Sequence, residues 1–149
     1  MTSSGRTPMQ QGFCGIEKRL DELRERLARL EPLTHKKRTD FDNDPYLRDI
    51  VERNLEVGAQ CCIDICHRVI ALEKAQKPAD AHDAILRMGE LGIVGSGFAK
   101  CLAPIAGFRN ILVHEYLGLN WDEIYSNLQR LEDLERFAEA VSVWIRESE

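Results

Sequence analysis

The sequence predicts an all-α protein, a bundle of four to five helices that are mostly antiparallel and joined by short connections. Apolar residues recur at intervals of three and four along nearly all of the chain after residue 13, which is the period of helices that bury one face. No stretch alternates apolar and polar residues between turn residues, as a half-buried strand does. At 149 residues the chain is long enough to bury a hydrophobic core. We therefore expect one domain over residues 13–149.

The first helix is expected from Ile16 to Leu30, because its apolar residues form a single stripe along one face. Pro32 and the charged residues that follow end this helix. Residues 1–12 are mostly polar, and we expect them to form a disordered tail. The stripe consists of Ile16, Leu20, Leu23, Leu27 and Leu30.

The second helix is expected to be the longest. Asp44 is a favourable N-cap and Pro45 suits the first helical position, whereas residues 76–78 close the helix. At roughly 30 residues it would be about 45 Å long, so we expect it to be the spine of the domain. Small residues along it would let a neighbouring helix approach closely, from the same chain or from a second copy. They are Gly58, Ala59, Cys61 and Cys62.

A third helix is expected to begin near Asp80 and to stop at a glycine within residues 92–95, since glycine accepts the left-handed backbone that often ends a helix. The apolar segment after it contains Pro104 and Gly107, which predict a kink or a break. Beyond that break, the helical segment is expected to end at Gly118.

The last helix is expected to begin after Asn120, a favourable N-cap. Asp122 and Glu123 follow in its first turn, where the helix dipole stabilises acidic side chains. Its buried stripe is expected to comprise Ile124, Leu128, Leu131, Leu134, Phe137, Ala138, Val141 and Trp144.

The charge of the chain argues against a broad nucleic-acid-binding surface. The net charge is −5 and the isoelectric point about 5.4, so phosphate backbones would not be attracted to the surface as a whole. A local site built from a few arginines is still compatible with this charge. The basic cluster His35–Arg38 is interpreted as a solvated linker rather than a nucleic-acid contact.

The cysteines favour a reducing compartment. Their number, five, is odd and no secretory signal is recognised, so we expect no disulfide framework and a cytoplasmic location. No apolar run approaches the roughly 20 residues of a membrane helix. Cys62 and Cys66 have a spacing that two metal ligands can use, but burial as small apolar side chains is favoured. The three histidines outside residues 108–116 are expected at the surface: His35, His67 and His82.

Residues 108–116 are the strongest functional signal, because Arg109, Asn110, His114 and Tyr116 interrupt an apolar helical segment. Polar groups avoid such segments unless they are paired or functional. Arginine binds phosphate, histidine exchanges protons near neutral pH, and tyrosine donates a hydrogen bond or accepts a modification.

Helical geometry separates these polar residues into two pairs. On an ideal helix Arg109 and Tyr116 share a face to within about 20°, and Asn110 and His114 share another, whereas Arg109 and His114 lie about 140° apart. One helix would not direct both at a single atom, which hints at a site completed by a second copy. A structural interpretation remains open, in which Arg109 pairs with a carboxylate and His114 caps the helix end.

The motif resembles the signature of the HEPN superfamily, an arginine followed a few residues later by a histidine. In its fuller form, R-N-x-L-V-H-x-Y, it is similar to the signature of the HepT toxins. The resemblance covers about residues 13–147. Its supporting segments are Tyr46–Ile70, Leu91–Val94, Leu102–Phe108 and Ile124–Tyr125.

The resemblance implies a HEPN-like homodimer and a metal-independent endoribonuclease without a cofactor, acting on RNA as a toxin. Arg109 would stabilise the scissile phosphate and His114 would act as general acid or base, while Asn110 would orient His114 or the RNA. An MntA-like nucleotidyltransferase antitoxin of a type VII toxin–antitoxin pair would block the toxin by transferring AMP from ATP to Tyr116. Asn54, beside the stripe of the second helix, would support the site.

Two other interpretations stay open. The chain could be a non-catalytic helical module that binds a nucleotidyltransferase partner or a nucleotide, which its acidic composition favours slightly. Alternatively, it could be a purely structural bundle whose polar residues only stabilise the fold.

Overall fold

The structure, a computed structural model, describes residues 8–115 and 117–148. Within them no strand is present, and the expected all-helical fold is confirmed. The helices are α1 (Pro8–Leu30), the 3₁₀ helix η1 (Glu31–His35), α2 (Arg38–Asp42), α3 (Pro45–Leu72), α4 (Ala81–Glu90), α5 (Ser96–Leu102), α6 (Ile105–His114), α7 (Trp121–Leu128) and α8 (Leu131–Ser148).

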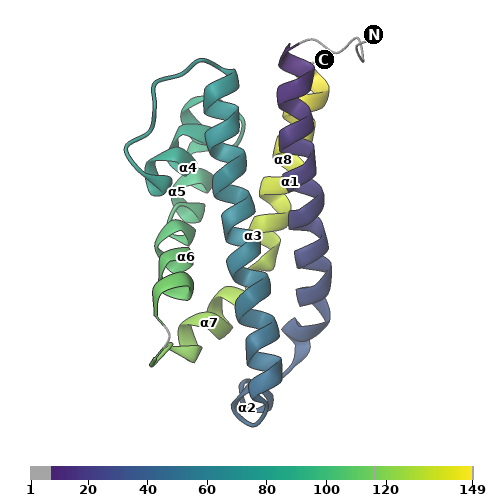
Figure 1. The fold of residues 1–149 in the computed structure, drawn as a ribbon, viewed down its shortest axis with the longest axis vertical. Coiled ribbons are helices and arrows are strands. Elements are labelled where there is room, and N and C mark those ends of the chain that lie inside the picture. The colour runs from purple at the N-terminus through teal and green to yellow at the C-terminus, as the bar shows by residue number, and fades with distance from the viewer. Residues whose placement is uncertain (1–7, 116, 149) are drawn as a thin grey trace.

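Helix α3 is the spine of the bundle, as expected (Figure 1). It packs against α1 on one side and against α4 and α6 on the other, and α8 lies beside α1. The chain runs down α1, up α3, down through α4, α5 and α6, and up α8. The carboxyl end of α6 therefore lies at the same end of the bundle as α2 and the start of α3.

Side-chain caps mark the amino-terminal ends of α3, α4 and α7. The carboxylate of Asp44 accepts a hydrogen bond from the Leu47 amide (3.1 Å). Asp80 accepts from the Asp83 amide (2.8 Å) at the start of α4. Asn120 accepts from the amides of the first turn of α7. Each side chain satisfies amides that have no partner within the helix.

The expected number of four to five helices is too low. One expected break is present, because α5 ends before Pro104 and α6 begins after it. The break between α7 and α8 carries no glycine or proline. Gln129 is the C-cap of α7, and its side-chain amide donates to the carbonyl of Thr34 (3.0 Å). A tertiary contact therefore accompanies the break in the last expected helix.

The amino-terminal part differs from the sequence prediction. Helix α1 begins at Pro8 rather than at Ile16, so residues 8–12 of the expected disordered tail are helical, and residues 1–7 lie outside the described part. Phe13 explains this extension, since it is buried and packs edge-on against Trp144 with ring centroids 5.4 Å apart. The stretch after Pro32 forms η1 and α2 instead of an irregular linker.

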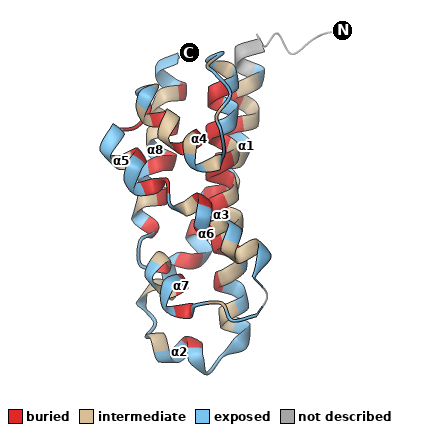
Figure 2. Ribbon diagram, turned by 90° about the vertical axis from the view of Figure 1, so that its left-hand side faces the viewer, coloured by how far each residue is buried: buried red, intermediate tan, exposed pale blue. Residues whose placement is uncertain are grey.

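The expected apolar stripes form the core (Figure 2). All five stripe residues of α1 are buried, as are those of α7 and α8 except Trp144, which is half-buried. Burial of these side chains drives the packing of the helices, since each removes apolar surface from water.

The central cysteines are buried, as expected. Cys62 and Cys66 are fully enclosed, and burial raises the pKa of both thiols well above the ordinary range. Burial also raises the pKa of Cys61 to about 11. Protonated, enclosed thiols are poor nucleophiles and poor metal ligands. The three histidines outside the motif are exposed, as expected.

The described residues contain neither a membrane-spanning helix nor a cluster of metal ligands. No helix within residues 8–115 and 117–148 combines the length and apolar character needed to cross a membrane. In the same part of the chain, no three histidine, cysteine, aspartate or glutamate side chains are grouped so that they could hold a metal ion.

The contact between α4 and α5 depends on Gly89. A Cβ atom at this position would lie 2.9 Å from the Ser96 Cα and 3.1 Å from the Ala99 Cβ. Because the first of these atoms is backbone, a larger residue forces the two helices apart. The close approach of α5 therefore requires glycine at this position, despite its low helix propensity.

We predict that Gly89→Ala lowers the free energy of unfolding by about 1–3 kcal/mol, through overpacking. Gly107 is the matched control, since it lies within α6 and a Cβ there meets nothing within 4 Å. Gly107→Ala should instead stabilise the protein by about 0.5–1 kcal/mol. Urea unfolding measures both, and equal effects of the two substitutions would contradict the steric explanation.

Candidate functional site

Helix α6 carries the motif that the sequence singled out. Pro104 separates it from α5, and Ala106 and Phe108 bury its inner face. Arg109 follows as a half-buried residue, and Asn110 and His114 are exposed. The apolar side of α6 thus fixes the helix, while its outer side presents the polar residues.

The guanidinium of Arg109 is held by two amide oxygens. Its Nε donates to the Oδ1 of Asn110 at 2.9 Å, and its Nη1 donates to the Oε1 of Gln60 on α3 at 2.5 Å. In the described part of the chain it has no carboxylate partner. The ion pair expected by the structural interpretation is therefore not formed there. Neutral amides orient the guanidinium without neutralising its charge.

The contact to Gln60 is the end of a longer polar chain. The amide nitrogen of Gln60 donates to the Oδ1 of Asp64 at 2.8 Å. The other oxygen of Asp64 lies 3.9 Å from the Nε of Arg19 on α1. These contacts connect α1, α3 and α6. Arg109 is thus positioned by groups on three helices rather than by α6 alone.

His114 is the last residue of α6. It is exposed, and its side chain makes no hydrogen bond to another described residue. The cap position is taken by Glu115, whose amide donates to the carbonyl of Ile111 at 3.0 Å. The described residues therefore do not support the alternative in which His114 caps the helix.

The end of α6 also changes the argument about Tyr116. Glu115 has an extended backbone (φ −103°, ψ 101°), so the helix stops two residues short of Tyr116. The expectation that Arg109 and Tyr116 share a helical face does not apply, because it assumed an uninterrupted helix. Tyr116 itself lies outside the described residues.

The structure brings Arg109 and Asn110 together, but no side-chain hydrogen bond joins either of them to His114 among the described residues. Five residues along a helix correspond to about 140° around its axis. Within one chain, the arginine and the histidine therefore project in different directions. Asn110 was expected to orient His114 or the RNA. Its Oδ1 accepts a hydrogen bond from Arg109, and its side chain makes no hydrogen bond to His114 among the described residues.

Asn54 occupies a different position from the motif. It is 5% exposed, and it is the one buried polar residue in the described part of the chain. Its amide donates to the carbonyl of Ile50 at 2.7 Å and accepts from Arg26 on α1 at 3.2 Å. The amide group therefore joins α1 to α3.

Sequence reasoning missed Gln60 and Asp64. They are four residues apart on α3 and flank a buried run, Cys61–Ile63. An i,i+4 polar pair beside an apolar run was a local signal for a shared face. Nothing in the sequence connected that face to Arg109, which is 49 residues further along the chain.

Comparison with protein families assigns the chain. Residues 23–141 match the family described as Ribonuclease HepT-like. The chain belongs to this family. The match contains α3, α6 and the motif, so it includes Arg109 and His114 as well as Gln60 and Asp64 on α3.

Individual relatives of this HepT-like chain agree with the assignment. It is 29% identical over 102 residues to the mRNA nuclease HepT of Shewanella oneidensis, covering 68% of this chain and 77% of that protein. It is also 29% identical over 110 residues to the tRNA nuclease HepT of Aphanizomenon flos-aquae, covering 74% and 75%.

A solved structure shares the fold. The tri-AMPylated Shewanella oneidensis HEPN toxin in complex with the MNT antitoxin matches with a TM-score of 0.76 and 23% identity. The match covers 93% of this chain and 99% of that chain. At this identity the likeness shows that the HepT-like chain has the HEPN toxin fold.

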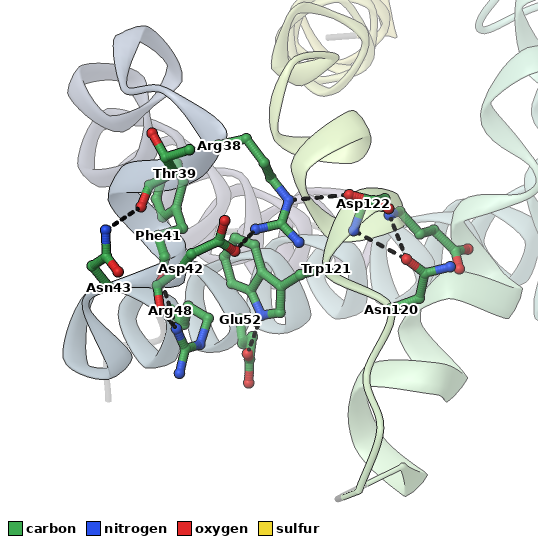
Figure 3. A network of polar contacts seen from close by, with 11 residues as sticks. Arg38, Thr39, Phe41, Asp42, Asn43, Arg48, Glu52, Asn120, Trp121 and Asp122 are labelled. Carbon is green, nitrogen blue, oxygen red and sulfur yellow. Dashed lines mark hydrogen bonds and ion pairs between the residues drawn. The ribbon is translucent and has the colours of Figure 1, made fainter.

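The HepT-like chain fixes the segment after the motif through Trp121 (Figure 3). The indole of Trp121 is stacked on Phe41 of α2, with centroids 5.2 Å apart, and its Nε1 donates to the Oε2 of Glu52 on α3 at 2.8 Å. Arg38 lies over the indole at 5.7 Å and pairs with Asp122 at 3.2 Å. We call Arg38, Phe41, Glu52 and Trp121 the tryptophan clamp.

We predict that Trp121 and Glu52 are energetically coupled. Trp121→Phe keeps the stacked ring but removes the donor, and Glu52→Ala removes the acceptor. A double-mutant cycle on the free energy of unfolding should give a coupling of about 1 kcal/mol. Trp144→Phe is the control, because Trp144 packs beside Phe13 instead. It should be additive with Glu52→Ala, and equal coupling for both tryptophans would contradict the clamp.

Proposed function

We propose that this HepT-like chain is an endoribonuclease toxin that cleaves RNA with Arg109 and His114 and needs no metal ion. The observation that carries the proposal is the state of Arg109. Amide oxygens of Gln60 and Asn110 orient its guanidinium, and no carboxylate of the described residues neutralises it. A cation oriented in this way is suited to bind a phosphate.

The chemistry follows from the two side chains. A histidine acting as general base removes the proton of an RNA 2′-hydroxyl, and the 2′-oxygen attacks the adjacent phosphorus. The bond from phosphorus to the 5′-oxygen breaks, and a general acid returns a proton to that oxygen. The products are a 2′,3′-cyclic phosphate and a 5′-hydroxyl. Because the nucleophile belongs to the RNA, DNA should resist cleavage.

The separation of Arg109 and His114 around α6 supports a homodimer, in which one copy supplies what the other lacks. An exposed stripe on α3 offers a surface for it. Tyr46 and Ile50 are 80% and 48% exposed, and the same helical face continues through Arg53 and Val57 to Gln60, which contacts Arg109. Exposed apolar residues on a face that leads to the site are the kind of surface that two copies bury.

The partner in this proposal is an MntA-like nucleotidyltransferase antitoxin. The phenolic oxygen of Tyr116 would attack the α-phosphorus of ATP, release pyrophosphate and lose its proton. The attached AMP would place an anion close to Arg109 in sequence and compete with RNA phosphate for the guanidinium. The fold shared with a tri-AMPylated toxin in complex with an MNT antitoxin supports this assignment.

A second candidate is a non-catalytic module that only binds the nucleotidyltransferase or a nucleotide. The net charge of −5 favours it, since an acidic surface repels RNA. The two candidates differ in one outcome, because only the ribonuclease cleaves RNA through His114.

We predict that the purified chain cleaves RNA in EDTA and that His114→Ala abolishes cleavage while the protein stays folded. The loss should be at least about 100-fold, the size of a general acid–base contribution. His82→Ala is the matched control, because His82 is also an exposed helical histidine outside the motif. Full cleavage by His114→Ala, with an unchanged melting temperature, would rule out the proposed chemistry.

We predict that Gln60 positions Arg109. Gln60→Met removes the acceptor and should lower kcat by about tenfold or more through misplacement of the guanidinium. Gln60→Glu restores an acceptor but adds a negative charge beside Arg109, so it should not rescue kcat and should raise KM for RNA. Melting temperatures separate these effects from unfolding. Wild-type kinetics in Gln60→Met would show that Gln60 does not position Arg109, and wild-type kinetics in Gln60→Glu would show that the added charge does not weaken phosphate binding.

We predict that Tyr116→Phe prevents inhibition. With the nucleotidyltransferase and ATP labelled at the α-phosphorus, the wild-type chain should gain label and lose RNA cleavage. Tyr116→Phe should gain no label, and its cleavage should not fall when the partner and ATP are added. Tyr46→Phe removes a strongly exposed tyrosine outside the motif and should still be labelled. Label on Tyr116→Phe would move the modification to another residue.

A further inference from the structure

The connection between α6 and α7, residues 115–120, exposes an apolar side chain. Leu117 is 90% exposed, more than any other large hydrophobic residue in the described part of the chain. Single exposed leucines are common on protein surfaces and carry no meaning alone. This one directly follows the residue that the proposed function assigns as the acceptor of AMP.

Both ends of the connection are fixed. At the upstream end, α6 is anchored by Ala106 and Phe108, and the Glu115 amide closes the last helical turn. At the downstream end, Asn120 caps α7 and the tryptophan clamp holds Trp121 against α2 and α3 (Figure 3). Leu117 is therefore displayed between two anchored points.

The backbone near Leu117 is turned by Gly118, which has a φ of +73°. Glycine adopts this conformation without the steric cost of a Cβ atom. Anchored ends limit the conformations of the residues between them, so binding costs less conformational entropy than it would in a free tail. Such a segment is suited to be recognised by a pre-formed pocket in another protein.

The surrounding charges favour a protein partner over RNA. Glu115 and Glu123 are exposed at the two ends of the connection, and neither forms an ion pair with another described residue. Carboxylates on both sides of Leu117 repel a phosphate backbone. They instead complement a surface that combines an apolar pocket with basic side chains.

We propose that Leu117 is a docking contact for the nucleotidyltransferase partner, which receives it in an apolar pocket bordered by basic residues next to its ATP site. The inference rests on the proposed function, because it assumes that the partner acts on Tyr116. Leu117 determines how well the partner engages the chain, and it takes no part in RNA cleavage.

The test uses the full chain and an MntA-like nucleotidyltransferase, with ATP labelled at the α-phosphorus. Leu117→Ser removes the apolar contact and should lower kcat/KM for AMP transfer by about tenfold or more, mainly through KM. Leu117→Met keeps a flexible apolar side chain of similar volume and should retain near wild-type transfer. RNA cleavage without the partner should be the same in both variants as in the wild type.

Four results would overturn the inference. Equal AMP transfer to Leu117→Ser and wild type would show that the partner does not read Leu117. Loss of transfer together with a change of oligomeric state in light scattering would assign Leu117 to an interface between copies. Loss of RNA cleavage in Leu117→Ser would assign it to the substrate path. If the wild-type chain accepts no AMP, the proposed antitoxin fails, and the inference fails with it.

Discussion

The burial of α3 on several sides is the constraint on which the rest of the structure depends. Because α1, α4 and α6 all pack against it, the position of each is fixed relative to the same axis. The motif on α6 can therefore be positioned by a side chain of α3, as Gln60 does for Arg109. Without that common axis, the polar chain through Asp64 to α1 could not form.

The partners of Arg109 show how a cation can be ordered and still remain available. A carboxylate would hold a guanidinium more strongly than an amide does, but it would also cancel the charge that attracts phosphate. Amide oxygens fix direction at a lower cost in charge. The carboxylate of this network belongs to Asp64, which does not contact Arg109. It accepts a hydrogen bond from Gln60, the residue that in turn accepts from Arg109. The contacts of Arg109 therefore differ from a structural ion pair, in which one partner both orients the cation and cancels its charge.

Features governed by neighbouring residues were predictable from the sequence. The caps at Asp44 and Asn120 and the apolar stripe of α1 follow from interactions within one helix, and they are present as expected. The end of α6 at His114 and the break at Gln129 were not predictable, because neither carries a glycine or proline at the boundary. The break at Gln129 coincides with a contact to Thr34, 95 positions away, which no local pattern reveals. The role of Gln60 was hidden for the same reason.

The tryptophan clamp also has a consequence for the order in which the protein is made. Its hydrogen bond joins residues that are 69 positions apart, and the neighbouring contacts of α7 with residues 34–38 span 84 to 95 positions. Loops of that length close late in folding. A nascent chain that has emerged from the ribosome only as far as His114 exposes the whole arginine–histidine motif, while its downstream anchor, Trp121, is still enclosed in the exit tunnel. The tryptophan clamp can form only when α7 has left the ribosome.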